Sequence, residues 1–177
     1  YLGEEDLKST DTQAIYAVWD DGKNTATVTK SQLVEQKISG TSITADPVDW
    51  GTQYGWFVDL AKAGERVSVS AQLYFGTLIV TSTIPSATEC QPGGSGRLYF
   101  LNYKTGGPVA GTTPIYNYVA PIVGITVAKL PGGTPKVYAI TATGGFPKGE
   151  PPTLPIDTSG LGGKLSGQRI MWRELVN

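Results

Sequence analysis

The sequence has 177 residues, with 23 glycines, 12 prolines, one cysteine and no histidine, and 14 Lys and Arg against 15 Asp and Glu give a net charge of −1. Within these residues the composition therefore excludes a Ser–His–Asp triad, a histidine-ligated metal and an internal disulfide. The near-zero charge also gives no basic field for nucleic acid or an anionic membrane.

Many turn residues separate short apolar segments along the chain. Charged residues are only 16%, yet 40% are hydrophobic and 10% aromatic. This balance is typical of short strands joined by turns, and no segment of ten or more residues has a helical apolar pattern. No run of about 18 apolar residues occurs, so the sequence predicts no membrane-spanning helix.

The N-terminal third alternates β-prone segments with turns. Asp21-Gly22 predicts a tight turn that returns the first strand as a hairpin. Lys30 to Val34 could form one helical turn with Thr29 as its N-cap, and Gly40-Thr41 marks a second small hairpin. The predicted strands here span residues 13–19, 25–29, 36–38, 42–45 and 55–60.

The rest of the chain gives stronger strand patterns. Residues 66–74 alternate, which places Val67, Val69, Ala71 and Leu73 on one face. Residues 77–83 are a continuous β-branched run, which predicts a strand buried on both faces. The remaining predicted strands span residues 96–102, 119–129, 136–142 and 168–176.

One strand-and-turn order suggests a repeating unit. Residues 71–107 run strand, Gly turn, apolar strand, Gly-rich loop, strand and Lys-Thr-Gly-Gly, which resembles a β-propeller blade of the pyrroloquinoline-quinone enzyme type. Units of about 40–45 residues fit a blade, and three can be drawn, with residues 168–176 as a closing strand. The alternative is a β-sandwich or barrel. The blade-like units span residues 14–58, 71–109 and 117–145.

An ordered series of short motifs carries a family resemblance over nearly the whole chain. The motifs are Tyr1-Leu2-Gly3-Glu4-Glu5-Asp6-Leu7, Ile15-Tyr16-Ala17-Val18-Trp19-Asp20-Asp21-Gly22, Gly55-Trp56-Phe57-Val58-Asp59-Leu60 with Gly64-Glu65-Arg66-Val67, Thr83-Ile84-Pro85-Ser86 with Cys90 and Gly93-Gly94-Ser95-Gly96, and Met171-Trp172-Arg173-Glu174-Leu175. Together they resemble the C-terminal β-propeller of the PilY family, the tip-associated adhesins and assembly factors of type IV pili in Gram-negative bacteria. In that family the first motif lies inside the propeller, so we expect residues 1–177 to be one all-β unit, the C-terminal part of a larger propeller.

The resemblance implies a secreted, non-enzymatic protein at the pilus tip or outer membrane, with roles in pilus assembly, adhesion and twitching motility. Its implied partners are pilin subunits or minor pilins, or a host or surface receptor. Some members carry a calcium loop, but the Asp-x-Asp/Asn-x-Asp/Asn-Gly pattern is absent from this sequence, so no cofactor is expected. Kinship with quinone dehydrogenases is a further alternative, although three blades cannot complete such a cofactor site.

Carboxylates beside aromatic residues form a second candidate for function. Asp46 and Asp49 lie near Trp50, Tyr54 and Trp56, a combination that a sugar-binding groove or a glycosidase pair would use. A secreted carbohydrate-binding or glycoside-acting β domain is therefore the alternative function. Core packing is the competing interpretation for Trp56.

Other polar features have simpler explanations. Cys90 could pair outside this chain. Residues 93–96 could pass for a phosphate loop, but they lack the following Lys-Ser/Thr and fit a hairpin loop better. The acidic groups at the N-terminus and first turn could bind a cation, but a solvated loop is the favoured explanation for Glu4, Glu5, Asp6 and Asp11. The Asp-Gly turn is the favoured explanation for Asp20 and Asp21.

Overall fold

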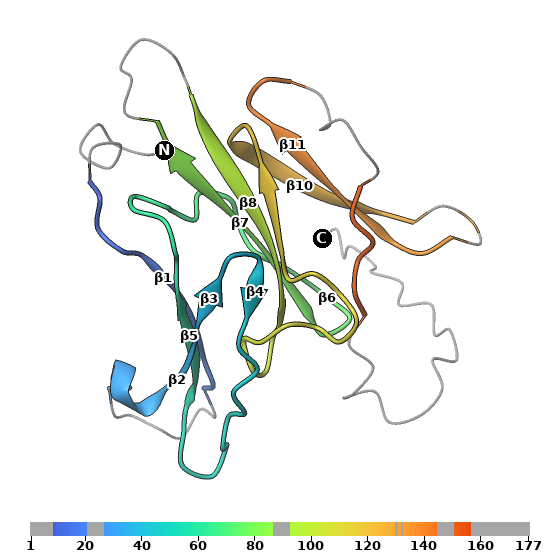
Figure 1. The fold of residues 1–177 in the computed structure, drawn as a ribbon. Helices are drawn as coiled ribbons and strands as arrows, with labels where there is room; N and C mark the ends of the chain where they lie inside the picture. The colour runs from blue at the N-terminus through green and yellow to red at the C-terminus, as the bar shows by residue number, and fades with distance from the viewer. Residues whose placement is uncertain are drawn as a thin grey trace, which may run out of the picture.

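The computed structural model describes residues 9–20, 27–86, 93–129, 131, 133–144 and 151–156. These residues are all-β, with one 3-10 turn and no α-helix among them (Figure 1). None of their helical segments is long and apolar enough to cross a membrane. The elements are β1 (Ala14–Val18), η1 (Lys30–Gln32), β2 (Val34–Gln36), β3 (Ile38–Ser39), β4 (Ser42–Ile43), β5 (Gly55–Asp59), β6 (Gln72–Tyr74), β7 (Thr77–Pro85), β8 (Gly94–Asn102), β9 (Ile115–Tyr118), β10 (Ile122–Ala128) and β11 (Lys136–Thr141).

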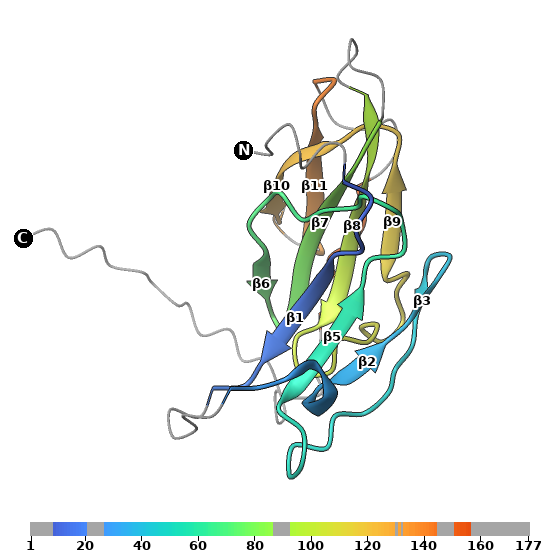
Figure 2. The ribbon, with the colours of Figure 1, turned by 90° about the vertical axis from the view of Figure 1, so that its left-hand side faces the viewer.

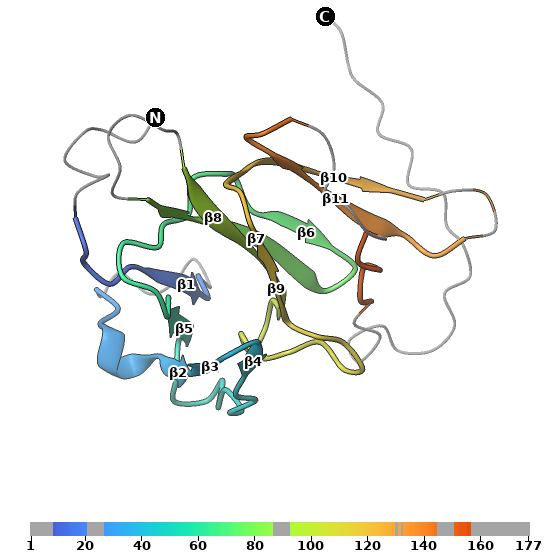
Figure 3. The same cartoon turned by 45° about the horizontal axis from the view of Figure 1, so that its top comes forward.

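The strands form open sheets that stack in three layers. The central layer is a four-stranded antiparallel meander in the order β6-β7-β8-β9. A three-stranded sheet, β1-β5-β2, covers one face, and the β10-β11 hairpin covers the other (Figure 3). Viewed from the side, β1 and β5 lie in front of β7 and β8 (Figure 2).

Alternation along β7 and β8 gives the central sheet two buried faces. Val80 and Tyr99 belong to the core cluster that Trp56 and Val58 of β5 complete. Their neighbours in sequence point the other way, and these pack against the β10-β11 hairpin: Ile79, Leu98 and Phe100. The predicted burial of residues 77–83 on both faces is confirmed, because each face of the strand meets a different apolar layer.

The described residues do not show the predicted N-terminal hairpin. Its turn at Asp21-Gly22 and residues 25–26 of its return strand lie outside the described residues, and residues 27–29 lie outside any strand. β1 pairs with β5, antiparallel, with Tyr16 opposite Phe57. This pairing places Ile15 and Ala17 against the core that Trp56 and Val58 occupy. A local return strand would forgo that burial, so the distant partner is favoured.

Two smaller N-terminal predictions are confirmed. The 3-10 turn begins after Thr29, whose backbone N–H donates to Gln32 Oε1 at 2.9 Å. The β3-β4 hairpin turns at Gly40, which has φ +62°. Both features depend on local chemistry, a capping polar residue and a glycine at positive φ.

The predicted strand over residues 66–74 is mostly wrong. Only β6 forms there, and Arg66 makes a single bridge to Thr83. On the face that the alternation defines, Val67 and Leu73 are exposed, at 42% and 57%. The side chain of Glu65 is fully buried against β7 and β8. This contact holds the chain to the sheet at one point, and the residues between Arg66 and β6 then leave the sheet.

The C-terminal part agrees with the predicted pair of strands. β10 and β11 pair antiparallel, with Ile125 opposite Ala139. β9, which the sequence analysis missed, completes the meander beside β8. The predicted closing strand at 168–176 lies outside the described residues.

No ring of blades is seen in the part of the chain that the structure describes. Residues 72–118 form the four-stranded meander. Residues 14–58 divide between two sheets, and β2 runs parallel to β5. The described residues thus form an all-β structure of several small open sheets.

Candidate functional site

Trp56, one of three predicted binding residues, is a core residue. Its side chain is fully buried on the inner face of β5, and its indole N–H donates to the backbone oxygen of Tyr103 at 3.0 Å. Gly106, in the same turn after β8, lies against the indole ring. The ring is thus closed to any ligand, which agrees with the core-packing interpretation.

Trp50 and Trp19 instead form an exposed pair, which we call the tryptophan pair. Their ring centroids lie 5.6 Å apart with an interplanar angle of 82°, an edge-to-face contact. Trp50 is 39% exposed and Trp19 56%. Trp50 is one of the predicted binding residues, whereas Trp19 was predicted only as part of a strand, because nothing local in the sequence indicates that the two residues meet.

Backbone hydrogen bonds hold the segments that carry this pair. The Trp19 N–H donates to the Tyr54 carbonyl at 2.8 Å, and the Tyr54 N–H donates to the Gln32 carbonyl at 3.1 Å. Tyr54, the third predicted binding residue, is half-buried and joins the two segments through its backbone. The loop between β4 and β5 is thereby tied to β1 and to η1.

The turn formed by residues 49–52, which includes Trp50, stabilises the ionised form of the Asp49 carboxylate. Asp49 accepts hydrogen bonds from the Gly51 N–H at 3.0 Å and the Thr52 hydroxyl at 2.8 Å. The Thr52 hydroxyl, and then the Gly51 N–H, lower the pKa of the Asp49 carboxyl. Both carboxylate oxygens of Asp49 thus serve the turn.

Asp46, the other carboxylate of the predicted glycosidase pair, is bound through its backbone. Gln36 Nε2 donates to the carbonyl of Asp46 at 2.7 Å and to that of Thr105 at 2.8 Å. Gln36 Oε1 accepts from the Thr44 hydroxyl and from the Asp46 N–H. The buried amide therefore joins β2, the segment after β4 and the turn after β8.

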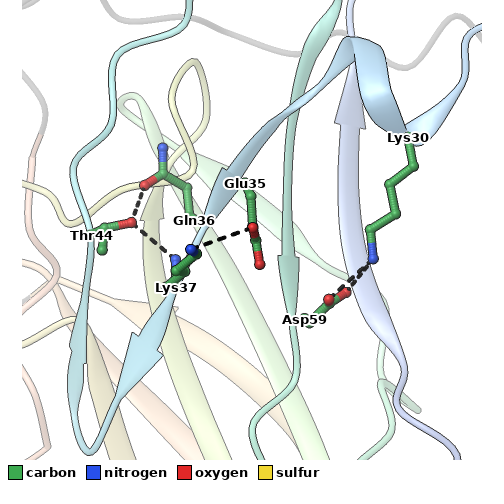
Figure 4. A network of polar contacts seen from close by, with 6 residues as sticks. All are labelled: Lys30, Glu35, Gln36, Lys37, Thr44 and Asp59. Atoms are coloured by element: carbon green, nitrogen blue, oxygen red, sulfur yellow. Dashed lines mark hydrogen bonds and ion pairs between the residues drawn. The ribbon is translucent and has the colours of Figure 1, made fainter.

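The outer face of the β1-β5-β2 sheet carries an ion pair beside two aromatic rings. Lys30 Nζ lies 2.9 Å from Asp59 Oδ1 and 4.2 Å from the centroid of the Phe57 ring. Tyr16 also stacks on Phe57, with the ring centroids 6.0 Å apart. Figure 4 shows the Lys30–Asp59 pair beside the network around Gln36 and Thr44. The Asp59 carboxylate raises the pKa of the Lys30 ammonium.

A buried polar cluster lies between the central sheet and the turn that precedes Arg66. Glu65 Oε1 accepts from the Ser82 hydroxyl at 2.5 Å and from the Tyr99 hydroxyl. Arg97 Nη1 lies 3.7 Å from Glu65 Oε2, close enough for attraction but too far for a hydrogen bond. Burial, and then the negative charge of Glu65, raise the pKa of the Tyr99 hydroxyl. The hydrogen bonds of the cluster join β7, β8 and the turn. Because the cluster is closed to solvent, it presents no reactive group.

The remaining predicted polar groups gain no ligand geometry. Among the described residues no three His, Cys, Asp or Glu side chains lie close enough to hold a metal ion. Cys90, Glu4, Glu5, Asp6 and Asp21 lie outside the described residues.

The described residues thus form an all-β scaffold with an exposed aromatic pair on loops that backbone hydrogen bonds tie together. No protein-family model matches the chain, and no solved structure does. The chain is similar to a protein of Xylella fastidiosa (strain Temecula1 / ATCC 700964) named type IV pilus biogenesis factor PilY1 homolog. The two are 27% identical over 129 residues, which cover 65% of this chain and 9% of that protein. The similarity is distant and partial, and it agrees with the family resemblance of the ordered motifs.

Proposed function

We propose that this chain is a non-catalytic β module of a type IV pilus biogenesis factor, acting outside the cytoplasm in pilus assembly and surface adhesion. The observation that carries the proposal is the similarity to the PilY1 homolog over 65% of the chain. A rigid β scaffold that presents loops is a suitable arrangement for such a role. Pilin subunits or minor pilins, or a surface receptor, are the proposed partners.

We also propose that the chain contributes blades to a larger β-propeller. The β6-β9 meander supports this proposal, because its four antiparallel strands follow one another in chain order, as they do in a blade. The β10-β11 hairpin would then begin the next unit. The chain spans only 9% of the PilY1 homolog, so the remaining blades would come from elsewhere in the longer protein.

An in-frame deletion of this segment from the parent gene tests the function. We expect fewer surface pili in sheared fractions and smaller twitching zones, because the segment would be missing from the assembly factor. An immunoblot must show that the shortened protein still reaches the cell surface. The Leu73→Ala variant of the full-length parent is the control, since Leu73 is 57% exposed and its replacement should leave the fold intact.

One outcome would contradict the proposal directly. Normal piliation and twitching, with the shortened protein present at the surface, would show that the segment is dispensable for pilus function.

A further inference from the structure

We propose that the tryptophan pair binds neutral oligosaccharides. The proposal gives a ligand class to the adhesive role proposed above, and it rests on that role.

The indole N–H groups distinguish this pair from the buried tryptophan. Trp56 donates its indole N–H to the Tyr103 carbonyl, as a buried indole normally must. In the ranges that the structure describes, the indole N–H of neither Trp19 nor Trp50 makes a hydrogen bond. A ligand that covered these rings would therefore have to supply oxygen acceptors, or it would leave two donors desolvated.

The exposed rings also require apolar contact from the ligand. Trp19 and Trp50 remain 56% and 39% exposed although they touch each other. A sugar ring has one face of C–H groups and a rim of hydroxyl oxygens, so it can cover an indole and accept from its N–H at the same time. An apolar ligand would cover the indole rings but would leave their N–H donors without acceptors.

The negative charge beside the pair selects against anionic ligands. Asp49 precedes Trp50 in the chain, and its turn holds the carboxylate ionised. Asp20 follows Trp19 directly. These carboxylates repel an anionic glycan, and an ammonium ligand offers no acceptor for the indole donors. A neutral, hydroxyl-rich ligand is the class that meets every requirement.

The site is arranged before a ligand arrives. The backbone N–H of Trp19 donates to the carbonyl of Tyr54. The backbone N–H of Asp49 donates to Gln53 Oε1 at 2.8 Å. Ligand binding would therefore need to order little of these loops. A low entropic cost of ordering favours affinity.

A glycan array that displays neutral and sialylated oligosaccharides, probed with the full chain, tests the proposal. We expect neutral glycans to bind and sialylated forms of the same glycans to bind less. Isothermal titration with the strongest neutral glycan should show that Trp19→Ala and Trp50→Ala each weaken binding by about tenfold or more, the loss typical of an aromatic anchor.

Matched controls separate binding from folding. Phe75 and Tyr103 are 53% and 41% exposed, and Phe75→Ala and Tyr103→Ala should leave the affinity unchanged. Trp50→Phe keeps a ring and removes the N–H, so it should bind with intermediate affinity. Circular dichroism and melting of each variant establish that it is folded.

Three outcomes would overturn the proposal: no neutral glycan bound above background, preference for sialylated glycans, or unchanged affinity in both tryptophan variants. The same variants in the parent protein distinguish this proposal from the proposed function. Lost piliation on deletion of the segment, with no glycan binding, would refute the glycan site alone.

Discussion

Gly106 lies where the turn after β8 crosses the indole of Trp56. Its φ is +74°, and a Cβ at this position would overlap the indole ring. The indole N–H is bonded to Tyr103 of the same turn, so the ring cannot move aside without losing that bond. Glycine is required at position 106 because it adopts a positive φ without strain and because it has no Cβ to overlap the indole ring.

Replacing Gly106 with alanine should therefore destabilise the protein more than the same change at Gly111. Both glycines have positive φ, +74° and +79°, but a Cβ at Gly111 meets nothing within 4 Å. The positive φ costs about 1–2 kcal/mol in either variant, and overpacking adds about 1–3 kcal/mol at Gly106 alone. Urea unfolding measures the difference, and equal losses would show that the turn moves freely away from Trp56.

Tyr99 predicts a dependence of stability on alkaline pH. Burial and the charge of Glu65 raise the pKa of its hydroxyl above the ordinary value. The folded state therefore keeps a proton that the unfolded state releases above about pH 10. Stability from this group is complete below that pH and falls by about 1.4 kcal/mol per pH unit above it.

The Tyr99→Phe variant isolates this effect. It should be less stable than the parent at neutral pH, because Glu65 loses a donor. The gap should narrow as the pH rises above about 10, since phenylalanine has no proton to lose. Urea unfolding across this range measures the gap, with Tyr103→Phe, an exposed tyrosine, as control. A gap that stays constant with pH would refute the assignment.

At the scale of elements, the β6-β7 hairpin has an unfavourable residue in its turn. Phe75 and Gly76 both have positive φ, 45° and 80°, between the paired residues Tyr74 and Thr77. A two-residue turn of this kind favours Asn-Gly, and a bulky side chain at positive φ is strained. The strain lies in an exposed position, so a replacement there need not disturb the core.

Phe75→Asn should accordingly stabilise the protein by about 0.5–1 kcal/mol relative to Phe75→Ala. Both changes remove the exposed ring, so their difference measures the preference of the turn. Thermal melting of the two variants is sufficient. An asparagine variant no more stable than the alanine variant would contradict the turn assignment.

The sequence predicted elements whose causes are local. The β-branched run of β7, the Thr29 cap of η1 and the glycine turns all depend on near neighbours. The pairing of β1 and β2 with β5 could not be predicted this way, because it is decided by which apolar faces bury one another. The tryptophan pair was missed for the same reason, since β1 brings Trp19 to Trp50 only after it joins β5.

At the scale of the whole molecule, the central sheet joins two cores. Ile79 and Val80 are neighbours on β7, and their side chains enter different cores. Cooperative unfolding of the three layers would follow from this shared strand. Damage to either core should then weaken both outer layers.

Ile79→Ala and Val80→Ala test this cooperativity. We expect losses of about 2–5 kcal/mol for Ile79→Ala and about 2 kcal/mol for Val80→Ala. The exposed Leu73→Ala should change stability by no more than about 0.5 kcal/mol. Tryptophan fluorescence and far-ultraviolet circular dichroism should give coincident transitions in every variant. Separate transitions for Ile79→Ala would show that the hairpin layer unfolds independently.

The pairing of β1 with β5 also affects the order in which the chain folds. β1 is the first described strand to be synthesised, but its partner follows only after residues 19–54. The β6-β9 meander has only sequence-adjacent pairings, and short loops close faster than long ones. We therefore expect the meander to form early and β1 to join late. Until then the exposed edge and apolar face of β1 are open to aggregation, so a chaperone that shields nascent strands should raise the yield of folded protein.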